Sequence, residues 1–222
     1  MNKSHIIGII LARKGSKRLK DKNLKKIKNV PLCEITINFA KKLKFLKNII
    51  ISSDDKRIIK LSKRKKILVL DRPKRLSKAQ TSSEETSFHL LNWYEKKFKK
   101  IDGILLLQPT SPFRSIENFN KAFRIFKKEK TAVIGVTKIN KNPKLYFLNR
   151  KRFILNRVLK KKNFFNYIDG SLYLIPRNIF FKQKTFVPKK FRPIENDKIK
   201  YSIDIDYEKD LKLARLMFNE NF

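Results

Sequence analysis

A basic loop that contains a glycine follows the first apolar run of the sequence, residues 6–11. An apolar run of this length that opens into such a loop is typical of a buried parallel strand ending at an anion-binding turn. Gly15 can adopt backbone conformations closed to other residues, and Ser16 offers a hydroxyl and an amide. Three cations surround the turn: Arg13, Lys17 and Lys22. We call residues 12–23 the glycine loop and expect it to bind phosphate, with a triphosphate as the best fit.

The glycine loop matches neither of the common phosphate-binding patterns. It lacks the second glycine that a Walker A sequence places before Lys-Ser/Thr, and it is not G-x-G-x-x-G. Side chains must therefore do much of the binding. The alternative is a solvated basic turn after an edge strand, which is common in lysine-rich chains.

Two carboxylates near the carboxyl end of the sequence could hold a cation. Residues 201–206 alternate in a way that predicts a strand with Asp204 and Asp206 on one face and Ile203 and Ile205 on the other. Adjacent carboxylates repel each other unless a cation lies between them, so a pair that faces a phosphate loop indicates a Mg²⁺ site. Alternatively, they cap the following helix or pair with nearby lysines.

Two further segments carry polar groups at the predicted ends of strands. Arg72, Thr81 and Ser83 could hydrogen-bond the edge of a base, although a serine followed by acidic residues at 82–85 equally predicts a helix N-cap. The segment 108–114, which we call the proline loop, places small hydroxyl residues between two prolines. Such a loop is stiff and holds its polar groups in place.

The composition indicates one globular α/β domain. The chain has 222 residues, of which 41% are hydrophobic, enough to fill one sizeable core. No apolar run is long enough to span a membrane and no cleavage site follows the first residues, so we expect a cytoplasmic protein without a membrane partner. One cysteine and two histidines exclude an internal disulfide and a Cys/His zinc site.

The net charge of +37 suggests a polyanionic partner such as nucleic acid. The basic residues are, however, scattered over nearly every predicted element and are mostly lysine, and the chain is also rich in Ile, Asn and Phe. All four types have A/T-rich codons, so a biased genome would produce this composition. The sequence also lacks an RNP-like aromatic pair, a finger and a helix-turn-helix. We therefore expect no nucleic-acid partner.

Strands and helices are expected to alternate over the first 137 residues. Strands are predicted at 6–11, 48–52, 67–70, 102–107 and 131–137, and helices at 31–43, 56–65, 83–98 and 115–126. This order predicts a parallel sheet whose functional loops share one side, with the most apolar strand, 102–107, at its centre.

The segment 138–199 departs from that alternation. Short strands at 145–148, 153–155 and 170–175 predict a lobe inserted into a single domain that spans 1–222. Its aromatic side chains would be a poor surface for a monomer, which favours a homodimer formed through the lobe. These aromatics are Phe164, Phe165, Phe180, Phe181 and Phe186. A last helix is predicted at 207–218.

Taken together, four motifs resemble the acylneuraminate cytidylyltransferase family, the CMP-sialic acid synthetases. They are Arg13-x-Gly15-Ser16-Lys17 with Lys22-Asn23, Arg72-Pro73, Gln108-Pro109-Thr110-Ser111-Pro112-x-Arg114, and Ser202-Ile203-Asp204-Ile205-Asp206. The resemblance runs in order from Ile6 to about Met217. The Lys14-Gly15-Ser16-Lys17 form of the first loop points to the nonulosonic-acid branch rather than to the related CMP-Kdo synthetases.

The resemblance implies a Rossmann-like nucleotidyltransferase fold, with three layers, a mostly parallel sheet and an inserted dimerisation and sugar-binding lobe. It implies an enzyme that transfers CMP from CTP to the C2 hydroxyl of a nine-carbon α-keto sugar acid of the sialic, legionaminic or pseudaminic type, and that releases pyrophosphate. A CTP-binding relative without catalysis, and a basic nucleic-acid-binding protein, are the alternatives.

The resemblance also implies roles for individual residues. Arg13, Ser16, Lys17 and Lys22 would hold the triphosphate at the turn that Gly15 makes, and Asn23, Arg72, Thr81 and Ser83 would surround the cytidine. Gln108, Thr110, Ser111, Arg114 and Tyr173 would face the sugar. Asp204 and Asp206 would bind Mg²⁺, and Asp206 is the better candidate for the base.

The chain departs from the family pattern before Asp169-Gly170. Where family members carry Arg-Gln and then Asn-Gly, this sequence has Leu159-Lys160-Lys161-Lys162-Asn163. The arginine that would grip the sugar carboxylate has no clean counterpart. A lysine at 160–162 or Arg157 could replace it, although lysine lacks the two-pronged geometry.

Overall fold

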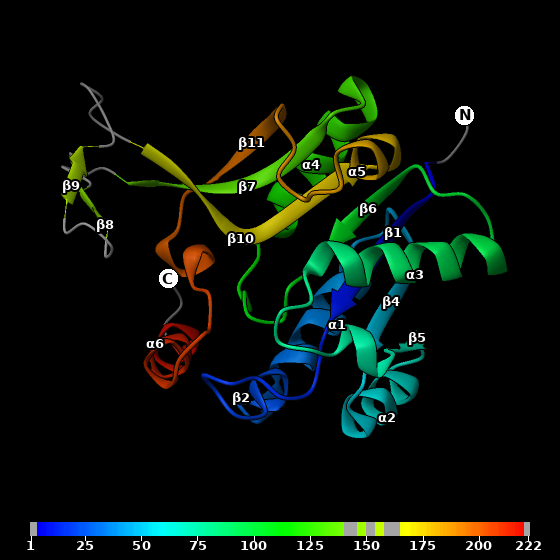
Figure 1. Ribbon diagram of the computed structural model, residues 1–222, viewed down its shortest axis with the longest axis horizontal. Coiled ribbons are helices and arrows are strands. Elements are labelled where there is room, and N and C mark those ends of the chain that lie inside the picture. The colour runs from blue at the N-terminus through cyan, green and yellow to red at the C-terminus, as the bar shows by residue number, and fades with distance from the viewer. Residues whose placement is uncertain (1–3, 140–145, 150–153, 158–164, 220–222) are drawn as a thin grey trace.

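A seven-stranded sheet forms the centre of the computed structural model, which describes residues 4–139, 146–149, 154–157 and 165–219. Its strand order is β11-β7-β10-β6-β1-β4-β5 (Figure 1). The bounds are β1 (Ile6–Leu11), β4 (Leu46–Ser53), β5 (Leu68–Asp71), β6 (Gly103–Leu106), β7 (Ala132–Ile139), β10 (Phe165–Pro176) and β11 (Phe191–Asn196). Neighbouring strands pair in parallel except that β10 runs antiparallel to both β6 and β7. The prediction that the strand within 102–107 is central is confirmed.

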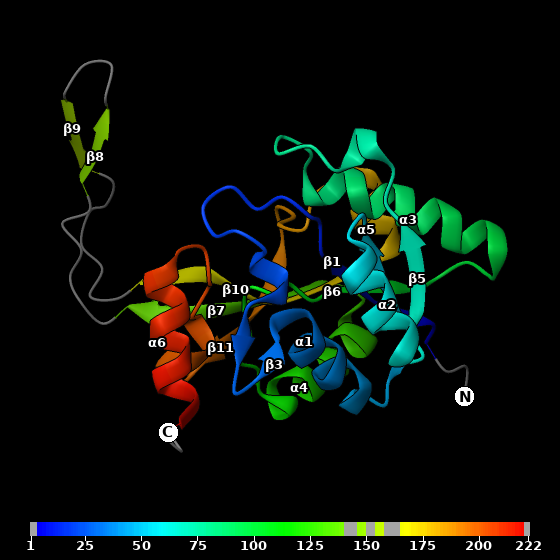
Figure 2. The same cartoon turned by 90° about the horizontal axis from the view of Figure 1, so that it is seen from below.

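Helices cover both faces of the sheet, which gives three layers (Figure 2). One face carries α1 (Leu32–Lys42), α2 (Lys56–Arg64) and α4 (Ile116–Glu129), and the other carries α3 (Ser83–Lys97) and α5 (Arg177–Gln183). β1 shows why both faces need cover: Ile6 and Ile10 pack with the first group, whereas Ile7 and Ile9 pack with the second. A strand that is apolar on both sides must be buried on both sides.

The predicted helix starts at 82–83 and 115 are confirmed by their caps. Ser82 accepts a hydrogen bond from the Glu85 amide at 3.0 Å, and the Glu85 carboxylate accepts one from the Ser82 amide at 2.9 Å. Ser115 accepts from the amide of Asn118 at 3.2 Å. The two reciprocal bonds at α3 and the single bond at α4 pair backbone amides that the first turn of a helix otherwise leaves without a partner.

The predicted strand at 201–206 is wrong. Residues Ile199–Ser202 form a 3-10 turn, and residues 203–206 have no regular structure before α6 (Glu208–Asn219). The alternation of apolar and polar residues has another cause. Ile203 and Ile205 are buried in a small core that is separate from the cores on the two faces of the main sheet. That core packs α6 against Leu19 of the glycine loop and against the hairpin of β2 (Lys26–Ile27) and β3 (Val30–Pro31).

The segment 138–199 contributes to the main sheet as well as projecting from it. β10 and β11 are strands of that sheet. Among the residues that the structure describes, β8 (Tyr146–Asn149) and β9 (Ile154–Arg157) pair only with each other (Figures 1 and 2). Phe180 and Phe186 are buried, at 0% and 3% exposure, against Phe88 and Tyr173 beneath α5. The expectation that they are exposed is therefore wrong: α5 covers one face of the sheet. Phe181 is half-buried; the side chains of Phe164 and Phe165 lie outside the part that the structure describes.

The remaining short elements are two 3-10 turns, Lys22–Leu24 and Lys74–Leu76. Among the described residues, no helix has the length and apolar character that crossing a membrane would require.

Candidate active site

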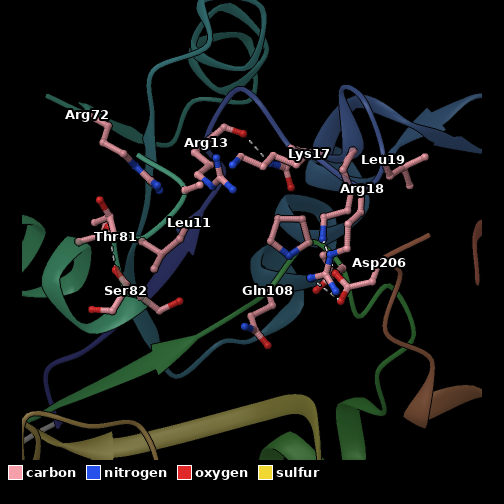
Figure 3. A pocket seen from close by; sticks show the side chains of 18 of the residues that line it. Leu11, Arg13, Lys17, Arg18, Leu19, Arg72, Thr81, Ser82, Gln108 and Asp206 are labelled. Atoms are coloured by element: carbon pink, nitrogen blue, oxygen red, sulfur yellow. Dashed lines mark hydrogen bonds and ion pairs between the residues drawn. The ribbon is translucent and has the colours of Figure 1, made fainter. Parts of the chain in front are cut away.

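A cavity of about 500 Å³ lies at the carboxyl ends of β1 and β6, beside the glycine loop (Figure 3). It brings together most of the residues that the sequence singles out. These are Arg13, Ser16, Lys17, Lys22, Asn23, Arg72, Thr81, Ser83, Gln108, Thr110 and Asp206. Gly15, Ser111, Arg114, Tyr173 and Asp204 are not part of its lining. The cavity lies where ligands bind in open α/β sheets.

Hydrogen bonds fix the conformation of the glycine loop. Gly15 has a φ of +75°, which favours glycine, and its carbonyl accepts a hydrogen bond from Arg13 Nη1 at 3.0 Å. The Asn23 amide group donates to the Arg13 carbonyl at 3.0 Å, and the Lys14 amide donates to Asp54 Oδ1 at 2.7 Å. Asn23, predicted to lie near the cytidine, lines the cavity and also braces the loop.

Arg72 comes from the end of β5 and is only 8% exposed. Its Nη2 donates to the Ser52 carbonyl at 2.9 Å and its Nε to the Ser52 hydroxyl at 3.3 Å. Burial, opposed by the charge of Asp54, lowers the pKa of Arg72 to about 10, so the guanidinium stays charged at neutral pH. Figure 3 shows Arg72, Thr81 and Ser82 on one side of the cavity, across from Arg18 and Asp206.

Asp206 is held by two cations of the glycine loop. Lys22 Nζ lies 2.7 Å from its Oδ1, and Arg18 Nη2 lies 2.8 Å from its Oδ2. The Asp206 amide donates to Asp210 Oδ2 at 3.0 Å, which fixes the backbone at the start of α6. Asp204 is exposed and lies outside the cavity lining. The two aspartates therefore do not both face the cavity.

The residues predicted to face the sugar divide into two groups. Gln108 and Thr110 line the cavity, and the Thr110 carbonyl accepts a hydrogen bond from the Ile205 amide at 2.8 Å. Ser111 is buried, and the Arg114 guanidinium is buried and donates to the Gln108 carbonyl. The proline loop thus contacts both the cavity and the segment that carries Asp206.

Tyr173 lies on β10, paired with Leu106 of β6 and Ile134 of β7. Burial raises the pKa of its hydroxyl to about 12, and the negative charges of Asp169 and Asp204 act in the same direction. The phenol therefore remains protonated at neutral pH and can act as a hydrogen-bond donor.

Three polar lining residues received no cavity role in the sequence analysis: Arg18, Ser82 and Thr86. Arg18 is one of 56 lysines and arginines, and only its ion pair with Asp206 distinguishes it. For Ser82, the sequence indicated only a helix N-cap. Thr86 lies one helical turn after Ser82 on the same face of α3, a spacing that could have indicated it.

Comparisons with known proteins agree with this geometry. Residues 7–220 match the model of a family described as cytidylyltransferase. The chain is 28% identical over 225 residues to the CMP-N,N'-diacetyllegionaminic acid synthase of Legionella pneumophila, with 97% of each chain covered. It is 26% identical over 226 residues to the N-acylneuraminate cytidylyltransferase of Escherichia coli, a match that covers 96% of this chain and 52% of that protein.

A solved structure shows the same fold. The CMP:2-keto-3-deoxy-manno-octonic acid synthetase in complex with CTP aligns with a TM-score of 0.72 over 99% of this chain and 100% of that one, at 15% identity. The expected Rossmann-like nucleotidyltransferase fold is therefore confirmed. Because the family match extends over nearly the whole sequence and includes every element that lines the cavity, the chain belongs to the cytidylyltransferase family.

Proposed function

We propose that this chain transfers CMP from CTP to the C2 hydroxyl of a nine-carbon α-keto sugar acid and releases pyrophosphate. The observation that carries the proposal is the cavity itself, in which the cationic glycine loop, Arg72 and Gln108 line one space. The similarity to a legionaminic acid synthase over 97% of both chains supports the acceptor class.

The lining suits the two ends of CTP. Arg13, Lys17 and Lys22 provide cations for a triphosphate, and the loop that carries them is braced before the nucleotide binds. Arg72, Thr81 and Ser83, on the other side, provide hydrogen-bonding groups for the cytosine and ribose. We assign the remaining side, with Gln108 and Thr110, to the sugar acid.

The carboxylates suit a Mg²⁺ ion that arrives with the nucleotide. Magnesium prefers oxygen ligands, and in nucleotide sites one or two carboxylates commonly hold it together with phosphates and water. The described residues contain no group of three His, Cys, Asp or Glu side chains placed to hold a metal. Asp206, the one aspartate of the predicted pair that lines the cavity, would therefore be the protein ligand, and phosphate and water oxygens would complete the coordination. When bound, Mg²⁺ neutralises phosphate charge and lowers the pKa of a nearby hydroxyl.

The reaction forms one P–O bond and breaks another. The C2 oxygen of the sugar attacks the α-phosphorus in line, the bond to the β-phosphate oxygen breaks, and pyrophosphate leaves. Arg13 and Lys17 stabilise the negative charge on the phosphoryl oxygens. The attacking hydroxyl loses its proton, and Asp206 is our candidate to accept it because its carboxylate faces the cavity.

We also propose a homodimer and a cytoplasmic location. The homodimer rests on the family resemblance, because Phe180 and Phe186 are buried and no longer argue for an exposed aromatic surface. The cytoplasmic location rests on the sequence pattern described above. Sedimentation equilibrium of the purified chain tests the dimer, and a single monomeric species contradicts it.

The decisive experiment measures pyrophosphate release with Mg²⁺, CTP and a panel of sialic, legionaminic and pseudaminic acids. Kdo, ATP and UTP serve as controls for the acceptor and the base. We expect release that requires both CTP and one nine-carbon acid. Arg13→Gln should reduce release. Arg192→Gln should not, because Arg192 lies on β11 and forms an exposed ion pair with Glu129 of α4.

The outcomes separate the alternatives. CTP binding without release for every acceptor would indicate a non-catalytic relative. Absence of CTP binding would contradict the proposal altogether. A polyanion-binding protein would instead bind DNA with an affinity that falls steeply as salt rises, and would be indifferent to Asp206.

A further inference from the structure

The Gln108 carbonyl accepts two hydrogen bonds from its own loop. The Ser111 amide donates to it at 3.1 Å, and Arg114 Nη2 donates to it as well. Gln108 lies two residues after the end of the central strand β6, and it lines the cavity. The backbone from which its side chain extends is therefore fixed by two donors.

Arg114 donates this hydrogen bond from a buried position. Its guanidinium is buried, and its Nε and Nη1 have no hydrogen-bond partner among the described residues. Burial alone lowers the pKa of Arg114 to about 9. The guanidinium carbon lies 5.5 Å from the centre of the Phe39 ring on α1, so an aromatic face is its other neighbour.

A buried arginine with free donors is costly, because desolvation of a cation is repaid only by good partners. An apolar residue of similar size would fill the same space at lower cost. The cation instead provides a charge-assisted hydrogen bond to one atom, the Gln108 carbonyl oxygen. The guanidinium that donates this bond lies against α1. Such bonds are about twice as strong as neutral ones.

The side-chain end of Gln108 is confined by Gly170. A Cβ atom at residue 170 would lie 3.2 Å from Gln108 Oε1 and 3.2 Å from Ser111 Oγ. Gly170 has a φ of +81°, at the point where the pairing of β10 with β7 shifts register between Ile168 and Tyr173. This irregularity brings a residue without a side chain next to the Gln108 amide.

We propose that Arg114 and Gly170 are positioning residues, which together fix the orientation in which Gln108 presents its amide to the acceptor sugar acid. Arg114 holds the main chain of Gln108, and Gly170 leaves the space that its amide occupies. The inference rests on the proposed function, since it takes the ligand of Gln108 to be the sugar acid. Fixing a hydrogen-bonding group before the ligand arrives lowers the entropy lost on binding.

The test compares Arg114→Met with Arg114→Lys in pyrophosphate release, with KM measured separately for the sugar acid and for CTP. Methionine fills the space without a donor, whereas lysine retains a cationic donor at the end of its side chain. We expect Arg114→Met to raise the KM for the sugar acid about tenfold, because one charge-assisted hydrogen bond is lost. The KM for CTP should stay within about twofold of the wild-type value. Arg114→Lys should restore most of the loss.

Three further variants complete the test. Gly170→Ala should also raise the KM for the sugar acid, and it remains informative if Arg114→Met fails to fold. In a Gln108→Ala background, Arg114→Met should add little, because the group that it positions is gone. Arg192→Met, on the exposed edge strand β11, is the control for removing an arginine.

Several results would overturn the inference. These are equal rises in both KM values, a lysine variant as impaired as the methionine variant, or full additivity with Gln108→Ala. If the wild-type chain releases no pyrophosphate with any acceptor, the proposed function fails first. In that case, the rate of amide hydrogen exchange in residues 106–114 tests whether Arg114 holds the main chain of Gln108. Exchange in Arg114→Met at the wild-type rate contradicts the inference. Exchange that is faster in Arg114→Met than in Arg114→Lys supports it.

Discussion

Lys22 Nζ and Asp206 Oδ1 lie 2.7 Å apart although 184 positions separate the two residues in the chain. This ion pair joins the glycine loop to the segment before α6, and Arg18 strengthens it from the other carboxylate oxygen. In the free protein, both oxygens of the proposed metal ligand are therefore occupied by cations. Nucleotide and metal binding must redistribute these charges.

Replacing Asp206 should separate nucleotide binding from turnover. We expect Asp206→Asn to reduce pyrophosphate release by about 100-fold or more, because it removes the proposed metal ligand and base. CTP affinity measured without Mg²⁺ should stay the same or increase, since Lys22 and Arg18 then lose their competing anion. Calorimetry of CTP binding and steady-state assays check the two parts. Asp197→Asn, at an exposed position, is the matched control; turnover retained in Asp206→Asn would contradict the assignment.

Replacing Arg18 should make metal binding easier in the absence of nucleotide. Arg18→Gln removes the cation that lies 2.8 Å from Asp206 Oδ2, so one carboxylate oxygen is released. We expect Mn²⁺, used as a paramagnetic substitute for Mg²⁺, to bind Arg18→Gln more tightly than the wild-type chain when CTP is absent. Electron paramagnetic resonance measures the free ion directly. Arg215→Gln, on the outer part of α6, controls for the change in net charge, and equal Mn²⁺ affinities would show that Arg18 does not compete with the metal.

Two glycines should respond differently to alanine. A Cβ on Gly15 would meet nothing within 4 Å, so Gly15→Ala has only the penalty of a positive φ, about 1 kcal/mol. We expect a weaker affinity for CTP and a loss of only about 1 kcal/mol in the free energy of unfolding. A Cβ on Gly103 would lie 2.5 Å from Phe126 Cζ in the core, so Gly103→Ala should destabilise the fold by about 1–3 kcal/mol. Urea denaturation and CTP titration of both variants test the contrast, which fails if Gly15→Ala is the less stable of the two.

The ion pair between Glu95 of α3 and Arg177 of α5 should make stability depend on pH. Arg177 Nε and Nη2 each lie 2.7 Å from a Glu95 oxygen, and these hydrogen bonds hold the pKa of Glu95 below its ordinary value of 4.5. The unfolded chain therefore binds more protons than the folded chain over this interval. The stabilisation is fully present above pH 4.5 and is lost as the pH falls through the folded-state pKa.

Glu95→Gln tests this dependence. We expect a loss of about 1–2 kcal/mol in the free energy of unfolding at pH 7, and a smaller difference from the wild-type chain as the pH is lowered below 4.5. Urea denaturation at a series of pH values measures it. Glu195→Gln, at an exposed position on β11, is the control. A difference that is constant with pH would assign the effect to packing rather than to charge.

Local patterns in the sequence were sufficient to predict the α-helices and the main-sheet strands of the first 137 residues, although not the β2–β3 hairpin. β1, β4 and β6 each contain consecutive large apolar residues, and α3 and α4 begin at serine caps. In these elements, the intrinsic propensity of the residues, the apolar pattern and the capping residues all predict the same secondary structure. The cavity residues that follow strand ends could be predicted for the same reason, because parallel strands bring their carboxyl ends to one edge.

The remaining features depend on contacts between distant segments. Ile203 and Ile205 alternate as in a strand, yet they are buried by α6 and the β2–β3 hairpin without any strand partner. Phe180 and Phe186 were expected to be exposed because periodicity does not reveal α5, the short helix that carries Phe180 and packs it against Phe88 and Phe186. Similarly, one lysine or arginine in such a basic chain gives no indication that Arg18 meets Asp206 or that Arg114 meets Gln108.

The small core that packs α6 against Leu19 also affects how the protein matures during translation. The sheet strands from β1 to β6 and their helices can begin to form as they leave the ribosome, since their contacts are largely with neighbouring elements. Asp206, however, is synthesised 184 residues after Lys22, which at about 5–20 residues per second is a delay of roughly 10–40 s. During that interval the glycine loop of the nascent chain lacks the carboxylate that pairs with Lys22 and Arg18, and the cavity acquires its full lining only when the segment before α6 docks.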